Sequence, residues 1–273
     1  MSAKHPEPTV TTSRFTAARG CVSDVALLAR RIPLFPVERT MPLAPLAAAR
    51  ADAAVRIGWA AIFLKAYGIV AQDMPVLRTW LVEGFLGATR RLATSSESVA
   101  TLAVTRVEQG EERLFWARLA RPDALPLPDI QRFVDDSTTK PVEEIFKRQL
   151  ELEMVPGVLR RTILRWNINS TSKKRATRIG TFSLSTLAGL GATNRFHPTI
   201  CTTSLSYGPL TADGSSLVTL IADHRVLDGA AAARALAAVE AVLLGDMARE
   251  LRSLPACLPP DVIPRAARRP DAA

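Results

Sequence analysis

The sequence predicts an α/β or α+β domain with a mixed β-sheet. Strand-like and helix-like runs interleave along the 273 residues, which is typical of one layered domain. No internal repeat breaks this order, and a chain of this length can bury a large core without disulfides. We expect the domain to span residues 21–254, with flexible tails at residues 1–20 and 255–273.

The first half of the chain predicts two helical segments around an extended one. Residues 23–33 have a short helical pattern with Ser23 as a possible N-cap. Prolines make the start of 34–54 extended, and helix formers follow from Ala44. Residues 55–75 predict a mostly buried helix that ends before Pro75.

The middle of the chain predicts a hairpin and then a helical region. Residues 98–120 alternate apolar and polar positions around "EQGEE", which indicates a β-hairpin. Residues 125–156 predict a turn at Pro128 and then helices, the second with Pro141 in its first turn. Residues 157–180 form a basic amphipathic stretch.

Three strand-like runs follow, at residues 180–189, 200–208 and 215–223. The sequence "TADGSS" between the last two is typical of a turn. Both faces of 215–223 are apolar or nearly so, which predicts a central, buried strand. The last helix is expected over 229–252.

The charge distribution predicts an anionic partner. The net charge is +9, and no acidic residue occurs from Met154 to Ala212. Such a local positive field attracts anions, among them nucleic acid, cofactor phosphates, acidic carrier proteins and an acidic membrane surface. Nucleic acid is not expected, because only Trp166 supplies an aromatic ring among the basic residues. The basic residues are Arg160, Arg161, Arg165, Lys173, Lys174, Arg175, Arg178 and Arg195.

The cysteines support neither a disulfide framework nor a zinc site. Cys21, Cys201 and Cys257 lie far apart with no CxxC spacing, which favours free thiols in a reducing cytoplasm. The N-terminus lacks a secretory signal, and no segment has about 20 continuous apolar residues, so we expect a cytoplasmic protein without a membrane span. No metal is expected.

His224 is the first candidate for chemistry. It follows the strand 215–223, where ligands of α/β sheets usually bind, and an imidazole there can act as a general base. Asp228, four residues later, can accept a hydrogen bond or pair with an arginine. The plainer interpretation is a histidine at a strand end that is hydrogen-bonded by Asp223 or Asp228.

The string "DHRVLDGAAAARAL" resembles the signature of the catalytic domain of dihydrolipoyl acyltransferases, and more loosely of chloramphenicol acetyltransferase. "GTFSLSTLAGLGATNRFHPTI" looks like the strand and loop of that family, and the resemblance covers about residues 20–252 in the same order. It implies a two-layer α/β fold like that of chloramphenicol acetyltransferase, in which a mixed sheet is flanked by helices. It also implies a homotrimer whose active sites lie between subunits.

The resemblance also implies roles for three residues. His224 would be the general base that lets an acceptor attack a thioester directly, without an acyl-enzyme. Ser185 would stabilise the oxyanion from the neighbouring subunit, with Ser183 as the alternative if the register slips by two. Asp228 would be a structural support paired with an N-terminal arginine such as Arg19. His197 is expected to be a loop or interface residue.

The donor would be acyl-coenzyme A or an acyl group on carrier-protein phosphopantetheine. Arginine and lysine bind such phosphates well, so we assign the basic residues of one segment to the cofactor. The same segment could instead dock an acidic carrier protein, or be an ordinary solvated face. The assigned residues are Lys173, Lys174, Arg175 and Arg178.

The chain departs from the family pattern in its middle, where "ERLFWARLARPDALPLPD" replaces a Gly-Leu-x-x-Pro-Val segment, and it has no lipoylation motif. We therefore expect a free-standing acyltransferase for an unknown thiol, hydroxyl or amine acceptor. Two alternatives remain open. One is a non-catalytic scaffold subunit of a multi-enzyme assembly, and the other is the acyltransferase core of a 2-oxoacid dehydrogenase complex with its lipoyl domain on another chain.

Overall fold

A computed structural model describes residues 10–13, 15–84, 89–108 and 110–254. The predicted tail at 255–273 lies outside these residues. The strands are β1 (Leu34–Pro42), β2 (Thr79–Glu83), β3 (Arg90–Thr94), β4 (Val99–Glu108), β5 (Glu111–Ala120), β6 (Phe182–Leu184), β7 (Thr203–Tyr207) and β8 (Ser215–Asp223). The α-helices are α1 (Ala17–Ala29), α2 (Ala44–Asp52), α3 (Trp59–Asp73), α4 (Leu127–Thr139), α5 (Val142–Ile145), α6 (Lys147–Glu153), α7 (Gly157–Ile168), α8 (Lys173–Ile179), α9 (Gly229–Val242) and α10 (Ala248–Ser253).

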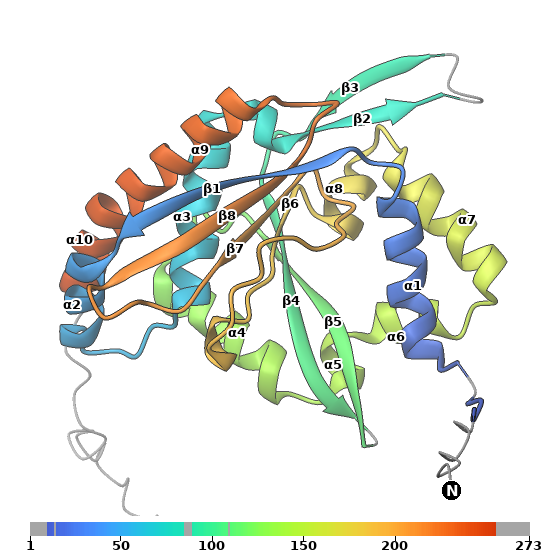
Figure 1. Cartoon of the computed structure of the whole chain (residues 1–273), viewed down its shortest axis with the longest axis horizontal. Coiled ribbons are helices and arrows are strands. Elements are labelled where there is room, and N and C mark those ends of the chain that lie inside the picture. Colours follow the sequence, from blue (N-terminus) through green and yellow to red (C-terminus); the bar gives the residue numbers. More distant parts are fainter. Residues whose placement is uncertain (1–9, 14, 85–88, 109, 255–273) are drawn as a thin grey trace, which may run out of the picture.

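The main sheet has six strands in the order β1-β8-β7-β6-β4-β5 (Figure 1). The central pairs β4–β6 and β6–β7 are parallel, and the other three pairs are antiparallel. The predicted mixed sheet with flanking helices is therefore confirmed. The short strands β2 and β3 form a separate two-stranded sheet.

One face of the main sheet packs on the core. The side chains of Phe182, Leu184 and Leu205 join it together with the almost fully buried helix α3. Tyr67 of α3 packs its ring 4.5 Å from that of Phe182 and hydrogen-bonds through its hydroxyl to Thr203 Oγ1 at 2.7 Å. In Figure 1, α3, α9 and α10 lie together at the β1–β8 side, and α1, α6 and α7 lie at the β4–β5 side.

Most predicted elements have the expected type and place. The strand β1, the helix α2 from Ala44, the hairpin β4–β5 and the buried strand β8 all match the sequence pattern. The predicted helix 229–252 is continuous but contains a π-helical turn at Leu243–Met247 between α9 and α10. Pro128 lies in the first turn of α4 rather than in a preceding turn.

The start of α1 differs from the prediction. The helix begins at Ala17, so residues 17–20 are helical rather than part of a tail. Thr16 Oγ1 caps it by accepting a hydrogen bond from the Arg19 amide at 3.3 Å, and Ser23 therefore lies inside the helix. The strands β2 and β3 were not predicted.

Candidate active site

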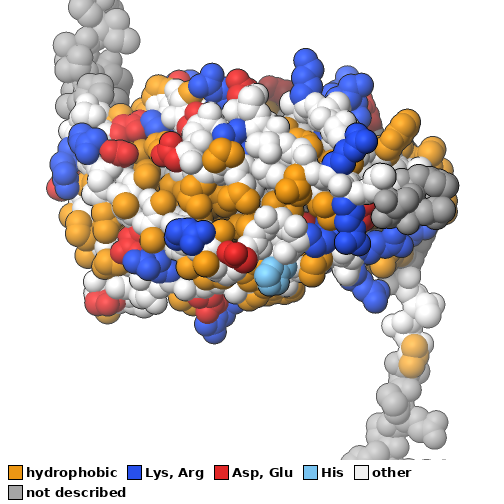
Figure 2. All heavy atoms as spheres, turned by 90° about the horizontal axis from the view of Figure 1, so that it is seen from above, with side chains coloured by type: hydrophobic (Ala, Val, Ile, Leu, Met, Phe, Trp, Pro, Cys, Tyr) orange, Lys and Arg blue, Asp and Glu red, His pale blue; other side chains and the backbone are white. Residues whose placement is uncertain are grey.

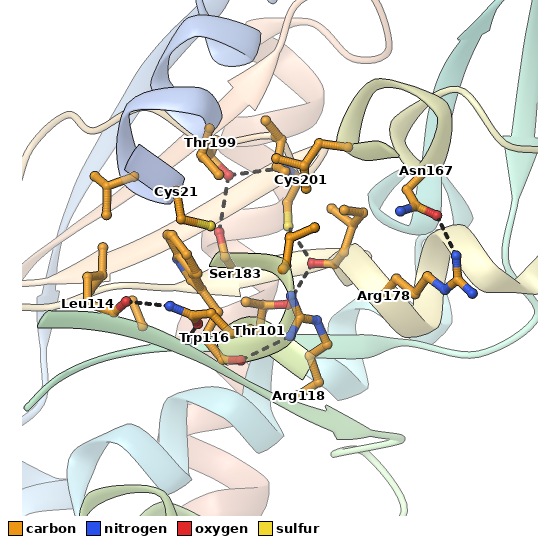
Figure 3. Close-up of a pocket in the computed structure, with 18 of the residues that line it drawn as sticks. Cys21, Thr101, Leu114, Trp116, Arg118, Asn167, Arg178, Ser183, Thr199 and Cys201 are labelled. Carbon is orange, nitrogen blue, oxygen red and sulfur yellow. Dashed lines mark hydrogen bonds between the residues drawn. The ribbon is translucent and has the colours of Figure 1, made fainter. Parts of the chain in front are cut away.

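A cavity of about 510 Å³ lies against the second face of the sheet, which does not pack on the core. Its walls come from β4, β5 and β6 on one side and from α1, α6, α7 and α8 on the other. Ser183, Ser185 and His197 all line it, so we call it the Ser185 cavity. Figure 3 shows the contributing strands, with Cys21 approaching from α1.

Ser185 follows directly after β6, and its side chain lines the cavity. Its backbone amide donates to Leu205 O at 3.0 Å, which fixes this residue in the sheet. The predicted face is confirmed, because Phe182 and Leu184 point into the core while Ser183 and Ser185 point into the cavity.

Ser183, the alternative candidate, is already hydrogen-bonded. Its hydroxyl donates to Ser204 Oγ at 2.7 Å and lies 3.3 Å from Thr199 Oγ1. Within the residues that the structure describes, no hydrogen bond involves the Ser185 hydroxyl. Ser185 is thus the serine whose hydroxyl is available to a ligand in the cavity.

His197 is more than the loop residue that the sequence suggested. Its Nε2 lies 2.7 Å from Ser204 Oγ and its Nδ1 lies 3.1 Å from Asn194 Nδ2, so both ring nitrogens are engaged. Burial lowers the pKa of His197 to about 4. The neutral ring joins the loop to β7 through Ser204. The sequence did not predict this contact, although Asn194, His197 and Ser204 lie within eleven positions.

His224 lies at the end of β8 and is exposed. Its backbone amide donates to Pro33 O at 3.0 Å, and its ring lies 4.6 Å from that of Phe35. The plainer interpretation fails here, because neither neighbouring carboxylate bonds the imidazole. Asp223 instead accepts from the Arg225 side chain at 2.9 and 2.8 Å.

Asp228 is the N-cap of α9, and its carboxylate accepts from the Ala231 amide at 2.8 Å. The predicted ion pair between Asp228 and Arg19 does not form within the described part of the chain. Arg19 lies in the first turn of α1, whereas the end of α1 is the part that leads into β1 beside His224. Asp228 therefore fixes the turn after His224 by capping a helix.

His224 and Ser185 of one chain lie far apart. Leu184 is level with Leu205 in the register of β6 and β7, so Ser185 is level with Ser206, which pairs with Thr219 of β8. His224 is five residues beyond Thr219, which corresponds to roughly 16 Å along the strand direction alone. His224 also does not line the Ser185 cavity. One chain therefore cannot bring both side chains to one reacting carbonyl group.

The four predicted phosphate ligands do not form one cluster. Lys173 and Lys174 are exposed in the first turn of α8, and Arg178 lines the Ser185 cavity while donating to Asn167 Oδ1 at 2.9 Å. On the face in Figure 2, lysine and arginine side chains lie around a central apolar area.

Arg175 is not available to a phosphate, which corrects its assignment. It is 2% exposed, and its two terminal nitrogens donate to Gly180 O at 2.7 Å and Ile200 O at 2.9 Å. Its guanidinium also lies 5.4 Å from the ring centre of Trp80. Sequence reasoning missed this because both carbonyl partners become neighbours only through the parallel pair β6–β7.

The described part of the chain contains no cluster of three or more metal-ligating side chains. It also contains no helix that is long and apolar enough to cross a membrane.

Comparison with known proteins finds no matching family model and no matching curated protein. Solved structures do match. A probable dihydrolipoamide acetyltransferase from Listeria monocytogenes superposes with a TM-score of 0.60 at 15% identity, covering 93% of this chain and 100% of that one. The truncated catalytic core of a 2-oxoacid dehydrogenase complex from Thermoplasma acidophilum gives 0.63 at 13% identity, with coverages of 86% and 99%.

The dihydrolipoamide acetyltransferase of Azotobacter vinelandii gives a TM-score of 0.60 at 18% identity, covering 90% of this chain and 95% of that one. That enzyme was investigated for the catalytic roles of a serine, a histidine and an asparagine. At such identities the likeness concerns the fold. This chain thus has the fold of the catalytic cores of dihydrolipoamide acetyltransferases.

Proposed function

We propose that this protein is an acyltransferase that moves an acyl group from a coenzyme A or carrier-protein thioester to a thiol, hydroxyl or amine acceptor. The observation that carries the proposal is the pair of incomplete half-sites. One half-site is an exposed imidazole at a strand end, and the other is an available serine hydroxyl in a cavity. Each supplies a group that the other lacks, so the proposed site is completed between two copies of the chain, as in a homotrimer.

In the proposed step, His224 removes the proton from the acceptor while the acceptor attacks the thioester carbonyl carbon. The resulting oxyanion accepts a hydrogen bond from Ser185 of the neighbouring copy. Collapse breaks the carbon–sulfur bond, and the imidazolium returns its proton to the departing thiolate. A placed base contributes about a hundred- to ten-thousandfold to the rate, and one oriented oxyanion donor contributes about 3 kcal/mol.

Two further features support this assignment. In the Azotobacter enzyme, the histidine and asparagine under investigation are four residues apart, as are His224 and Asp228. Asp228 then serves as a positioning residue, since its cap fixes the turn that follows His224.

The donor phosphates are assigned to the exposed Lys173 and Lys174, with Arg178 at the cavity wall. Lysine and arginine both bind phosphate through charge-assisted hydrogen bonds. An acidic carrier protein would use the same two lysines.

The test measures loss of thioester by mass spectrometry for short and long acyl-coenzyme A donors, with dihydrolipoamide and simple amines as acceptors. His224→Ala and Ser185→Ala should each lower turnover by about a hundredfold or more. The decisive experiment co-expresses these two variants. Mixed assemblies should recover about a quarter of the wild-type sites, because only interfaces with an intact serine facing an intact histidine work.

The matched control co-expresses His224→Ala with the double variant His224→Ala, Ser185→Ala, which contains no intact histidine and should stay inactive. A mixture of the single variants that also stays inactive contradicts a shared site. A wild-type protein that consumes no donor with any acceptor favours the scaffold alternative, and turnover restricted to dihydrolipoamide favours the dehydrogenase-core alternative.

A further inference from the structure

The Ser185 cavity contains a cation that the proposed acyl transfer does not use. Arg118 lies on β5 and lines the cavity together with Leu114 and Trp116 of the same strand face. The side chain of Arg118 is exposed and borders the cavity. Figure 3 shows Arg118 beside Thr101 and Trp116.

Arg118 has no acidic partner in the described part of the chain. Its single hydrogen bond there runs from Nη1 to Trp116 O at 3.0 Å. Glu151 also lines the cavity but forms no ion pair with Arg118. Burial, and to a smaller extent the positive charge of Arg148, lower the pKa of Arg118, which remains a charged guanidinium at neutral pH.

Two other arginines near the cavity do have acidic partners, in contrast to Arg118. Arg113, on the same strand, forms an ion pair with Glu153, and Arg160 of α7 pairs with Asp24 of α1. These pairs occupy the buried carboxylates of the helices that cover the cavity. A guanidinium that lines a cavity and has no acidic partner is available to an anionic ligand.

The rest of the wall is mainly apolar and comes from α1, α6, α7 and the segment before β7. A cavity of about 510 Å³ is the size of small-molecule sites, which combine apolar walls with a few polar groups. The apolar residues are Val22, Val25, Ala26, Leu152, Val155, Ile163, Leu164 and Ile200.

We propose that the Ser185 cavity binds an amphipathic anion, with a carboxylate or phosphate head on Arg118 and an aliphatic body among α1, α6 and α7. Arg118 supplies the geometry for this head, since a guanidinium can donate two parallel hydrogen bonds to one carboxylate or phosphate. Arg148 of α6, which also lines the cavity, adds a second positive charge close to Arg118. The binding does not require acyl transfer, so it can hold or fail independently of the proposed function.

The experiment titrates the purified full chain with octanoate, octyl phosphate and 1-octanol by isothermal calorimetry. We expect octanoate, octyl phosphate or both to bind at least about tenfold more tightly than the neutral alcohol. A preference for one of the two anions identifies the head group. Equal affinity for all three ligands, or no binding of either anion, overturns the proposal.

Arg118→Met should weaken anion binding by about tenfold or more while leaving 1-octanol unaffected. Arg118→Lys keeps the charge but lacks the planar guanidinium. Its affinity for octanoate should lie between those of the wild type and Arg118→Met. Arg132→Met is the matched control, because Arg132 is an exposed residue of α4 paired with Asp129. Unchanged octanoate affinity in a folded Arg118→Met protein contradicts the assignment, and Arg118→Gln provides the same test if the methionine variant does not fold. Ser185→Ala should retain octanoate binding, which separates this result from loss of acyl transfer.

Discussion

Arg160 of α7 and Asp24 of α1 form a buried ion pair, with Nε 2.6 Å from Oδ2. The Arg160 guanidinium also donates to the backbone carbonyls of Glu153 and Val155 at 3.3 Å. This single side chain therefore connects α1, α6 and α7, three of the four helices that cover the Ser185 cavity.

Asp24→Asn should destabilise the protein by about 3 kcal/mol or more, because it leaves a buried guanidinium without its counter-charge. The measurement is the free energy of unfolding in urea. Asp129→Asn is the control, since it removes an exposed partner of Arg132 and should cost about 1 kcal/mol or less. Equal losses in the two variants would mean that the Asp24 pair does not connect the helices as described.

His197 should make the stability of the protein depend on acidity. Its folded-state pKa is about 4 and its ordinary value is 6.5, so the unfolded chain takes up a proton first as the pH falls. This contribution to stability is complete above pH 6.5 and is lost between pH 6.5 and about 4, by about 3 kcal/mol in all. Urea unfolding at pH 7 and pH 5 should show a smaller loss for His197→Gln than for the wild type. Identical losses would contradict a buried neutral imidazole.

Arg118→Met should change the stability of the ligand-free protein by less than about 0.5 kcal/mol, because Arg118 is exposed and has no ion-pair partner to lose. Arg113→Met is the matched change on the same strand and should destabilise the protein, since it leaves Glu153 without its ion-pair partner. Thermal unfolding of the two variants gives the comparison. A loss of stability in both would show that Arg118 has a partner of its own.

Cys21 should react slowly with alkylating reagents even though it lines a cavity. Burial raises the pKa of its thiol to about 11, and the thiolate is the reactive form. In a Cys257→Ser variant, alkylation by iodoacetamide should accelerate about tenfold per pH unit from pH 8 to 10. Peptide mass spectrometry follows Cys21 and Cys201 separately. Fast alkylation of Cys21 at pH 7 would contradict the buried environment, and octanoate should slow the reaction if it fills the same cavity.

The sequence predicted the elements whose pattern is local. The alternation in β4 and β5, the proline-rich extended start of β1 and the apolar run of β8 all depend on neighbours within one segment. The placement of Ser185 opposite Phe182 and Leu184 follows from the same alternation.

The parts that the sequence did not predict depend on contacts between distant segments. Arg175 is buried where its guanidinium donates to Gly180 O, at the end of its own helix, and to Ile200 O of a distant segment. Its position in a basic run suggested a solvated residue instead. Arg118 had one local signal, since alternation places it on the same strand face as Leu114 and Trp116. That signal cannot show whether a carboxylate is near. Here Glu153 pairs with Arg113 instead.

The hydrogen bonds of Arg175 also bear on the order in which the chain folds. Gly180 precedes β6 and Ile200 precedes β7, so one guanidinium from α8 holds the starting points of the two parallel central strands. Parallel neighbours need long crossovers whose closure is slow. We expect this parallel pairing to become stable only once α8 has docked, because the Arg175 guanidinium can then hold both strand starts.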